Sequence, residues 1–252
     1  MPNYTLVDFD SILYAACLCS KDEQEDGFEI DKDTVIQKIN SSINGLFNTL
    51  KNTYDYNTDA YKLFITDKNN WRKIIYKDYK SNRKDRPKPH LLGFARDYAE
   101  NELNAFRADL CEADELLLCT KKHLEKDFDN NVVIASLDKD LYQTAGKFFN
   151  LFHTRYNLVT VDEQQALQNR WKQCLIGDST DGFKFLHGLG AKGAEKLLKD
   201  VTTNMGALRV VYAEYIKRLG RVHGREKFLL TYRLAVMPTE NIPYATEFET
   251  LF

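Results

Sequence analysis

The spacing of hydrophobic residues predicts alternating strands and helices over the first 160 residues. Short apolar runs bounded by polar residues are typical of buried strands, and they occupy residues 4–9, 61–66, 131–137 and 148–152. From residue 31 the apolar residues recur every three or four positions, which indicates a core-facing helix with Asp31 or Asp33 as its N-cap. A helix is also expected after the first strand, and a helical stretch from about His90 to Lys126. This alternation predicts an α/β fold with a mainly parallel central sheet flanked by helices.

The remainder of the chain has a different pattern, in which helices are separated by glycine turns. We therefore expect an α/β domain at residues 1–160 and a helical region at residues 161–252. A chain of 252 residues is long enough to bury a large core. No basic segment precedes an apolar run at the start, and no stretch approaches eighteen apolar residues, so we expect a soluble, unexported protein without a membrane partner.

Carboxylates directly follow three of the predicted strands. Asp8 and Asp10 end the first strand, Asp67 ends the second, and "SLDKDL" places Asp138 and Asp140 after the third. Because ligands of an open parallel sheet bind beyond the carboxyl ends of its strands, these acids should meet at one edge. Taken singly, an acid in the first turn of a helix caps that helix, and an Asp after a strand starts a turn. Further acids stand in "CEADELLL" and "IGDSTDG", namely Glu112, Asp114, Glu115, Asp178 and Asp181.

The complete set of acids needs a further explanation, because close-set carboxylates repel one another and raise one another's pKa unless cations neutralise them. Mg²⁺ and Mn²⁺, which take carboxylate and water ligands, are suitable occupants. The five cysteines include no C-x-x-C pair and the five histidines are isolated, which leaves oxygen as the ligand atom. Two such ions form the clamp used for phosphodiester hydrolysis. The formal net charge of −2 then conceals a basic remainder of the molecule.

A basic segment, "WRKIIYKDYKSNRKDRPKP", carries features of nucleic-acid binding. Charge runs are usually solvated loops, but Tyr76 and Tyr79 interleaved with cations suit a surface that stacks on bases and follows phosphates. Trp71 and Trp171 are instead expected in the core. The cations of the segment are Arg72, Lys73, Lys77, Lys80, Arg83, Lys84 and Arg86.

A glycine motif in "HGLGAKGAEKLL" places Gly188, Gly190 and Gly193 in the spacing G-x-G-x-x-G. A dinucleotide site would need a strand running into the motif, and the preceding "GDSTDGFKFL" is loop-like. The overlapping "GDSTDGFK" resembles a phosphate loop but has Phe183 where the lysine belongs. Glycine lets a backbone approach a ligand, and a helix N-terminus presents N–H groups to an anion. The motif is therefore weak evidence for a dinucleotide site and leaves open which phosphate the turn could hold; Lys192 adds a positive charge beside it.

The sequence resembles the 5′-nucleases, a family that includes flap endonucleases, the 5′-3′ exonuclease domain of bacterial DNA polymerase I, phage 5′-exonucleases and phage ribonuclease H. The resemblance implies a PIN-like nuclease domain, a basic helical arch at about residues 70–110 and a helix-three-turn-helix at about residues 177–200. It also implies a phage or bacterial source, and thus the cytoplasm of a bacterium or of a phage-infected host. Five motifs carry it in chain order: "LVDFDSILYAA", "FITDKNNWRKIIYKDYKSNRKDRPKP", "CEADELL", "ASLDKDLYQ" and "IGDSTDGFKFLHGLGAKGAEKLL".

The resemblance further implies a role for individual residues. Lys80 and Arg83 match a basic pair that contacts the scissile phosphate at the base of the arch. Gly188, Gly190 and Gly193 match the turn that grips one strand of duplex DNA through backbone amides, with a K⁺ ion at the turn. Two Mg²⁺ ions, which Mn²⁺ can replace, are expected at the acids. Those matching the first ion are Asp8, Asp67, Glu112, Asp114 and Asp138; those matching the second are Asp140, Asp178 and Asp181, with Glu115 near both.

The function implied is that of a monomeric, metal-dependent, structure-specific 5′-nuclease. It would cleave DNA at or near free 5′ ends, including flaps, nicks and RNA primers on RNA–DNA hybrids, in replication or repair, alongside proteins such as a polymerase or a single-strand-binding protein. Three departures from the family pattern affect this expectation. The segment between the basic stretch and "CEADE" is short and helical, which leaves open whether the arch is a closed tunnel or a mobile clamp. Glu115 stands where the family usually has a second aspartate, and "DGFKFLHGLG" replaces the usual D-N-I-P-G-V-P-G-I-G.

Two alternatives remain open. A DNA-end binding protein without catalysis would have no reason to keep so many mutually repelling carboxylates. A ribonuclease with a similar acidic site would lack the downstream glycine turn that this chain has.

Overall fold

The computed structural model describes residues 1–19, 30–83, 87–128, 130–151 and 157–238. Contacts divide the chain into two units. The sheet unit comprises the described residues of 1–68, 86–137 and 147–159, and the helical unit those of 69–85, 138–146 and 160–252. Two segments of the expected first domain, 69–85 and 138–146, belong to the helical unit by contact. The expected division into domains at residue 160 stays a prediction.

The sheet unit is built on a single sheet with the strand order β3-β2-β1-β4-β5-β6 among the described residues. The pairs β1–β2, β1–β4, β2–β3 and β4–β5 are all parallel, which confirms the expected α/β class. The chain builds outward in opposite directions from β1 and from β4, so the carboxyl ends of these two strands form a topological switch point, where ligands of open α/β sheets bind. The strands are β1 (Asn3–Asp8), β2 (Ala60–Ile65), β3 (Phe106–Arg107), β4 (Asn131–Ser136), β5 (Gly146–Asn150) and β6 (Leu158–Val161).

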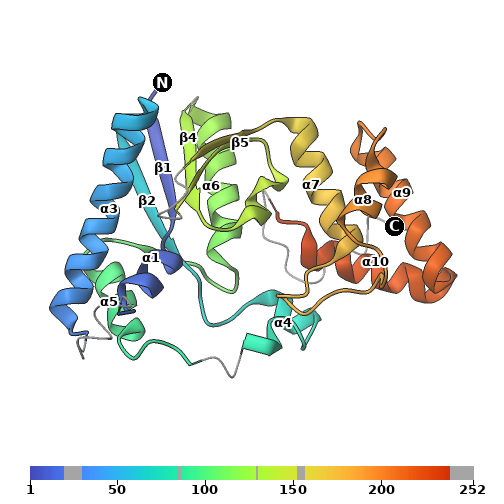
Figure 1. Cartoon of the computed structure of the whole chain (residues 1–252), viewed down its shortest axis with the longest axis horizontal. Coiled ribbons are helices and arrows are strands. Elements are labelled where there is room, and N and C mark those ends of the chain that lie inside the picture. Colours follow the sequence, from blue (N-terminus) through green and yellow to red (C-terminus); the bar gives the residue numbers. More distant parts are fainter. Residues whose placement is uncertain (20–29, 84–86, 129, 152–156, 239–252) are drawn as a thin grey trace. The chain divides into compact units, whose positions relative to one another are not determined.

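Helices cover both faces of this sheet (Figure 1). Helix α6 (Ala113–Phe128) packs on β1, β2 and β4, whereas α1 (Phe9–Ala16), α3 (Lys32–Tyr54) and α5 (Leu92–Asn101) pack together on the other face. Side chains alternate across a strand, so Val7 joins the core under α1 and α3 while the adjacent, equally buried Leu6 points to the opposite face. Burial on both faces explains why the strands are continuous apolar runs rather than alternating ones.

The helix predicted from residue 31 is confirmed as α3, and the Asp31 carboxylate caps it by accepting a hydrogen bond from Thr34 N at 2.8 Å. The helical stretch predicted from His90 to Lys126 is instead two helices, α5 and α6. Between them the chain enters the sheet as β3, where Phe106 pairs with Phe64. Asn104 and Leu110 adopt left-handed backbone conformations, which end helical winding on either side of β3.

The helical unit packs its helices around a second core. Trp171 is buried in this core, and the Tyr215 hydroxyl lies 2.9 Å from Cys174 O and 2.8 Å from Thr231 Oγ1. The expectation that Trp71 and Trp171 are buried is confirmed. The helices are α4 (Trp71–Ile75), α7 (Glu163–Ile176), α8 (Ala191–Leu198), α9 (Asn204–Leu219) and α10 (Arg221–Ala235), with the short 3₁₀ helices η1 (Ser81–Arg83) and η2 (Lys139–Gln143).

The segment 69–85 is held in the helical unit by aromatic and cationic side chains. Arg72 is 2 % exposed, lies 4.7 Å from the centre of the Trp71 ring and donates from Nε to Leu234 O at 3.1 Å. Tyr79 is also buried and stacks on Phe183, one of the residues that depart from the family pattern. The expectations that Arg72 contacts DNA and that Tyr79 stacks on bases are therefore wrong for this structure. Both side chains find better partners in the interior.

Two general features concern the chain as a whole. Over the described ranges, no helix combines the length and the apolar character needed to cross a membrane. Cys17, Cys111 and Cys174 are buried. Burial raises the pKa of the Cys174 thiol to about 12, so this side chain is a neutral thiol at physiological pH.

Glycine at position 224 is required by the crossing of α9 and α10. A Cβ there would lie 2.6 Å from Tyr215 O, a backbone atom that cannot rotate away. We expect Gly224→Ala to lower the free energy of unfolding by about 2 kcal/mol, even though alanine favours helix by about 1 kcal/mol. Gly45→Ala in α3, where a Cβ would meet nothing within 4 Å, should raise it by about 1 kcal/mol. Urea denaturation compares the two, and equal stabilisation by both changes would contradict the packing argument.

Candidate functional site

The nine predicted site acids are divided between the two units, and each part is built separately. The sheet unit carries Asp8, Asp67, Glu112, Asp114 and Glu115, and the helical unit carries Asp138, Asp140, Asp178 and Asp181. Within the described ranges, no group of three or more His, Cys, Asp or Glu side chains is arranged to hold a metal ion. The metal-ligand roles therefore stay predictions.

Asp8 lies at the topological switch point of the sheet. It is the last residue of β1, and the parallel register that pairs Val7 with Ala135 brings it beside Ser136, the last residue of β4. Ser136 Oγ donates a hydrogen bond to Asp8 Oδ2 at 2.9 Å. This bond fixes one carboxylate oxygen at the carboxyl edge. The sequence interpretation missed Ser136, although it directly precedes the "LDKD" motif.

The start of α6 is tied to the end of β2. Ala113 N donates to Thr66 Oγ1 at 3.1 Å, so the first turn of α6 lies near the strand end that carries Asp67. Glu115 is fully buried and accepts a hydrogen bond from Glu112 N at 3.0 Å, the return bond of a capping box. Helix capping thus accounts for one oxygen of Glu115, as the simpler explanation of first-turn acids anticipated.

Asp10 has a partner that the sequence did not reveal. Its Oδ1 lies 2.6 Å from Arg96 Nη2 in α5, and its Oδ2 accepts a hydrogen bond from Thr66 N at 2.8 Å. The carboxylate therefore joins α1, β2 and α5 at the same edge of the sheet. A cation and an acid 86 residues apart leave no local sequence signal.

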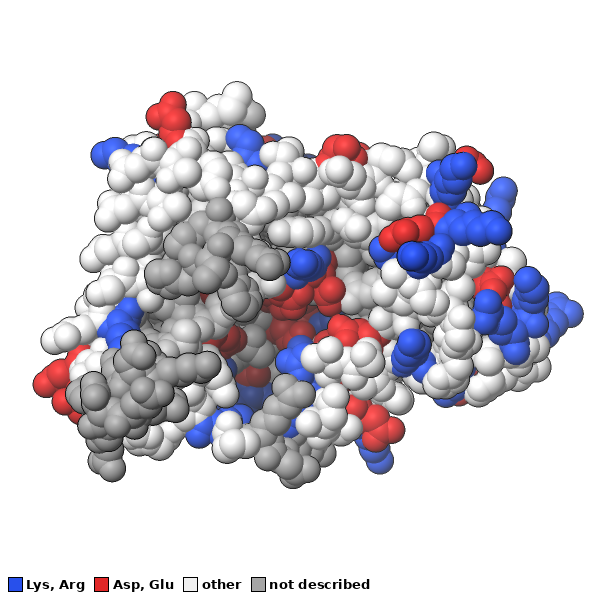
Figure 2. Space-filling model, viewed as in Figure 1, with Lys and Arg blue, Asp and Glu red and all other residues white. Residues whose placement is uncertain are grey.

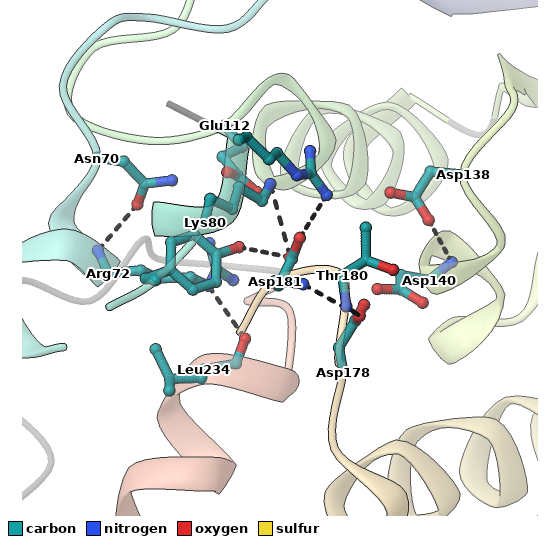
Figure 3. A network of polar contacts seen from close by, with 12 residues as sticks. Asn70, Arg72, Lys80, Glu112, Asp138, Asp140, Asp178, Thr180, Asp181 and Leu234 are labelled. Atoms are coloured by element: carbon teal, nitrogen blue, oxygen red, sulfur yellow. Dashed lines mark hydrogen bonds and ion pairs between the residues drawn. The ribbon is translucent and has the colours of Figure 1, made fainter. Parts of the chain in front are cut away.

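In the helical unit the acids stand at the starts of two turns (Figure 3). Asp138 caps η2 by accepting from Asp140 N at 2.8 Å, and Asp178 Oδ1 accepts from Thr180 N at 2.6 Å. Asp178 also exchanges two backbone hydrogen bonds with Phe183, at 2.7 and 2.8 Å. Gly177 closes this turn in the left-handed region, and a Cβ there would lie 2.3 Å from Phe183 O. The acids are thus fixed at their backbones by turn chemistry.

Asp140 shows how strongly these carboxylates crowd one another. Burial, and next the negative charges of Asp138, Asp178 and Asp181, raise the pKa of the Asp140 carboxyl to about 7. A hydrogen bond of 2.6 Å from Gln173 Nε2 to Asp140 Oδ2 opposes this rise. A group of oxygen donors that repel one another to this extent has the chemistry that a hard divalent cation neutralises.

Two buried glutamines orient Asp140. Gln173 Oε1 accepts a hydrogen bond from Gln143 Nε2, which also donates to Ala235 O at 2.8 Å. The relay therefore links the acid to the end of α10. A pocket of about 460 Å³ adjoins it, and its lining includes Asp140, Gln173 and Asp178. Sequence reasoning missed both glutamines, because a polar residue on a buried helix face looks like a break in the pattern rather than a partner.

Lys80 and Arg83, the predicted phosphate-contacting pair, both bind Asp181. Figure 3 shows Lys80 beside this carboxylate. Arg83 Nη2 lies 2.5 Å from Asp181 Oδ1 and Lys80 Nζ lies 3.6 Å from Oδ2. The Tyr79 hydroxyl donates to the same Oδ2 at 3.0 Å. One buried carboxylate therefore pairs with both cations, and their contact with a scissile phosphate stays a prediction.

The glycine turn lies between α7 and α8 in the helical unit, with no strand running into it. Gly188 has a left-handed backbone with φ +76°, Gly190 is the N-cap of α8, and a Cβ at either position would meet nothing within 4 Å. Gly193 has a packing role instead, because a Cβ there would lie 2.8 Å from Leu189 Cδ1. Lys192 is exposed beside the turn.

The remaining predicted cations have different outcomes. Lys73 and Lys77 are exposed in the helical unit, and their contact with DNA stays a prediction. Lys84 and Arg86 lie outside the described residues.

A family comparison agrees with this arrangement. The family described as "5′-3′ exonuclease, N-terminal resolvase-like domain" matches residues 3–172. The chain belongs to this family. The family and the class of enzyme predicted from the motifs, a phosphodiester hydrolase, are thereby confirmed.

Relatives support the same assignment, and a solved structure shows a similar fold. The chain is 28 % identical over 187 residues to flap endonuclease Xni of Shewanella woodyi, covering 69 % of this chain and 73 % of that protein. It is 27 % identical over 154 residues to the Xni protein of Psychromonas ingrahamii, covering 56 % and 58 %. A flap endonuclease of bacteriophage T5, solved with DNA and metal ions, has a similar fold with a TM-score of 0.66. It is 16 % identical and covers 94 % of this chain and 90 % of that one.

The raised pKa of Asp140 predicts an unusual pH dependence of stability in the metal-free protein. The folded chain holds this proton more tightly than the unfolded chain, so the contribution of Asp140 to stability is greatest below about pH 4 and is lost as the pH rises to about 7. Asp140→Asn should therefore raise the free energy of unfolding by roughly 3–4 kcal/mol at pH 8 and by about half of that or less at pH 5. Urea denaturation in EDTA measures both values. Asp200→Asn, at an exposed position, is the control and should change the free energy of unfolding by less than about 0.5 kcal/mol at either pH. An increase in the free energy of unfolding from Asp140→Asn that is the same at both pH values would contradict the explanation.

Proposed function

We propose that this chain is a metal-dependent, structure-specific 5′-nuclease that hydrolyses DNA phosphodiester bonds at or near free 5′ ends and leaves 5′-phosphate products. The observation that carries this proposal is found within the helical unit. Asp181 belongs to a group of mutually repelling acids that a metal cation would neutralise. The same side chain pairs with Lys80 and Arg83, two cations that could bind a phosphate. A site that binds both metal ions and phosphate is the one that phosphodiester hydrolysis requires.

The acids of both units have the donor chemistry for two Mg²⁺ ions, with Mn²⁺ as a substitute. Such ions, when bound, lower the pKa of a water molecule and neutralise charge on the departing oxygen. The solved bacteriophage T5 relatives crystallised with metal ions support this part of the proposal. Asp8, Asp67, Glu112, Asp114 and Asp138 would hold the first ion, and Asp140, Asp178 and Asp181 the second, with Glu115 near both.

Lys80 and Arg83 would neutralise the negative charge that gathers on the phosphoryl oxygens. Asp181 holds the two cations ready, which reduces the side-chain entropy lost when a phosphate binds. Lys80 has a left-handed backbone with φ +54°, and its N–H donates to Asp181 O at 2.9 Å. An unfavourable conformation held by a hydrogen bond is typical of a functional position.

The glycine turn would hold duplex DNA beside the site, with a K⁺ ion at the turn. Its exposed backbone at Gly188 and Gly190, next to the N-terminus of α8, suits contact with a phosphate. Lys and Arg side chains gather over α8, α9 and α10 at the right-hand end of Figure 2. The exposed cations of these helices include Lys192, Lys196, Lys199, Arg209, Arg218 and Arg221.

The substrates proposed are 5′ flaps, nicked duplexes and RNA-primed strands, in replication or repair in the cytoplasm of a bacterium or an infected host. The names of the Xni relatives support flap cleavage. The test is cleavage of 5′-labelled flap, nicked and blunt duplexes, each with an RNA or a DNA 5′ segment, in Mg²⁺ and in EDTA. Mg²⁺-dependent cutting is expected near the junction or stepwise from the end. Tight binding without cutting in Mg²⁺ or Mn²⁺ would favour a non-catalytic DNA-end binder instead, and cutting confined to RNA would favour a ribonuclease.

A substitution at Asp138 tests catalysis separately from DNA binding. Asp138→Ala removes one proposed metal ligand but no cation that contacts DNA. We expect turnover to fall by at least about 10²-fold, while the affinity for a flap substrate in Ca²⁺ changes by less than about threefold. Single-turnover cleavage and fluorescence anisotropy measure the two. Retained turnover would exclude Asp138 as a necessary ligand.

Gly190 tests the contact with duplex DNA. A Cβ at this position fits the backbone, whose φ is −103°, and meets nothing within 4 Å, so Gly190→Ala should fold normally. The methyl group would hold a phosphate away from the α8 amides, and we expect duplex binding to weaken about fivefold or more. Gly45→Ala is the matched control, since its Cβ also meets nothing. Equal affinities of the two variants in anisotropy titrations would show that this turn is not the duplex contact.

A further inference from the structure

The sheet unit has a pocket that none of the motifs predicted. Its volume is about 500 Å³, within the range of small-ligand sites, and it lies between the end of β2 and the first turn of α5. Four cationic side chains line it, Lys68, Lys88, Arg96 and Arg107. Two acids, Asp67 and Asp97, line it as well, so cations are in the majority.

Two ion pairs build the walls of this pocket. Arg107 in β3 binds Glu100 in α5 through two bonds, Nε to Oε1 at 2.5 Å and Nη2 to Oε2 at 2.8 Å. Arg96 in α5 binds Asp10 at 2.6 Å. These pairs hold α5 to β3 and to the edge of the sheet, so the pocket is formed before any ligand arrives. A preformed site loses less entropy on binding.

Arg96 retains donor capacity toward a ligand. Its side chain is 23 % exposed and lines the pocket, although one of its terminal nitrogens binds Asp10. Lys68 and Lys88 are exposed on the two segments that flank the pocket, one after β2 and one before α5. The first turn of α5 adds the positive end of its dipole.

We propose that this pocket binds a phosphate group of the nucleic-acid strand that the enzyme cleaves. The proposal rests on the proposed function, because Asp67 belongs both to the pocket lining and to the acids assigned to the first metal ion. Neutralisation of Asp67 by that ion removes the nearest repulsion of a phosphate. The chemistry fits either the terminal phosphate at the 5′ end or an internal phosphodiester next to the scissile bond. In both cases the pocket fixes the position of the strand relative to the site of cleavage.

Lys88 is the residue to change, because Arg96 and Arg107 also hold the walls. The variants are Lys88→Ala and Lys88→Arg in the full chain, and the matched control is Lys51→Ala, an exposed lysine in the last turn of α3. The probes are 3′-fluorescein-labelled single-stranded oligonucleotides that carry either a 5′-phosphate or a 5′-hydroxyl group. Anisotropy titrations in Ca²⁺, which occupies the acids without supporting turnover, measure binding separately from catalysis. Thermal unfolding midpoints equal to that of the unmodified chain establish that the variants fold.

We expect Lys88→Ala to weaken binding about five- to tenfold and to lower the salt dependence by about one unit of slope, while Lys88→Arg and Lys51→Ala bind as the unmodified chain does. A loss confined to the 5′-phosphorylated probe assigns the pocket to the terminal phosphate. A loss on both probes assigns it to an internal phosphodiester. Affinities of Lys88→Ala equal to those of Lys51→Ala on both probes would overturn the proposal.

Cleavage separates this proposal from the proposed function. Absence of cleavage by the unmodified chain in Mg²⁺ would count against the nuclease and leave the binding comparison intact. Cleavage by Lys88→Ala at the same rate and the same positions as the unmodified chain would count against the pocket alone. A shift of the cleavage position along a 5′-phosphorylated strand would be the positive result.

Discussion

Repulsion between carboxylates at the ends of strands and turns is the constraint on which the rest of this structure depends. Three of the acids are held by specific donors: Ser136 on Asp8, Gln173 on Asp140, and Lys80, Arg83 and Tyr79 on Asp181. Most of these donors come from elements distant in the chain, so local folding alone cannot supply them. Long-range hydrogen bonds therefore hold mutually repelling carboxylates close together. Selection for stability alone would separate these charges instead.

The sequence predicted the elements that depend on local pattern. The parallel sheet, the long helix α3 with its Asp31 cap and the acidic strand ends all follow from hydrophobic spacing and turn chemistry, and the family motifs identified the chain. It missed β3, because two residues recruited as an edge strand have no periodicity to detect. It also misplaced Arg72 and Tyr79. A basic segment interleaved with aromatics looks like a nucleic-acid surface, and only the tertiary fold shows that Trp71, Phe183 and the end of α10 enclose two of its members.

The same limit applies to the candidate site. The order of the motifs in the sequence predicts which acids belong to the site, but it does not predict the partners that fix them. Arg96 pairs with Asp10 across 86 residues, and Gln143 donates to Ala235 across 92. Such pairs become visible only when the chain is folded. The pocket beside β2 belongs to this class as well. Its cations come from four separate places in the sequence, and no short stretch around any one of them resembles a phosphate-binding motif.

Contacts with the end of α10 determine the order in which parts of the chain reach their final structure during synthesis. Arg72 donates to Leu234 O and Gln143 donates to Ala235 O, so both inserted segments, 69–85 and 138–146, bind the last turn of the same helix. During synthesis these partners emerge about ninety residues or more after the segments that need them. The strands of the sheet unit can pair much earlier. The half of the acidic site that contains Asp140 is therefore the last to acquire its final contacts on the ribosome, and a chain cut short before residue 234 would lack them.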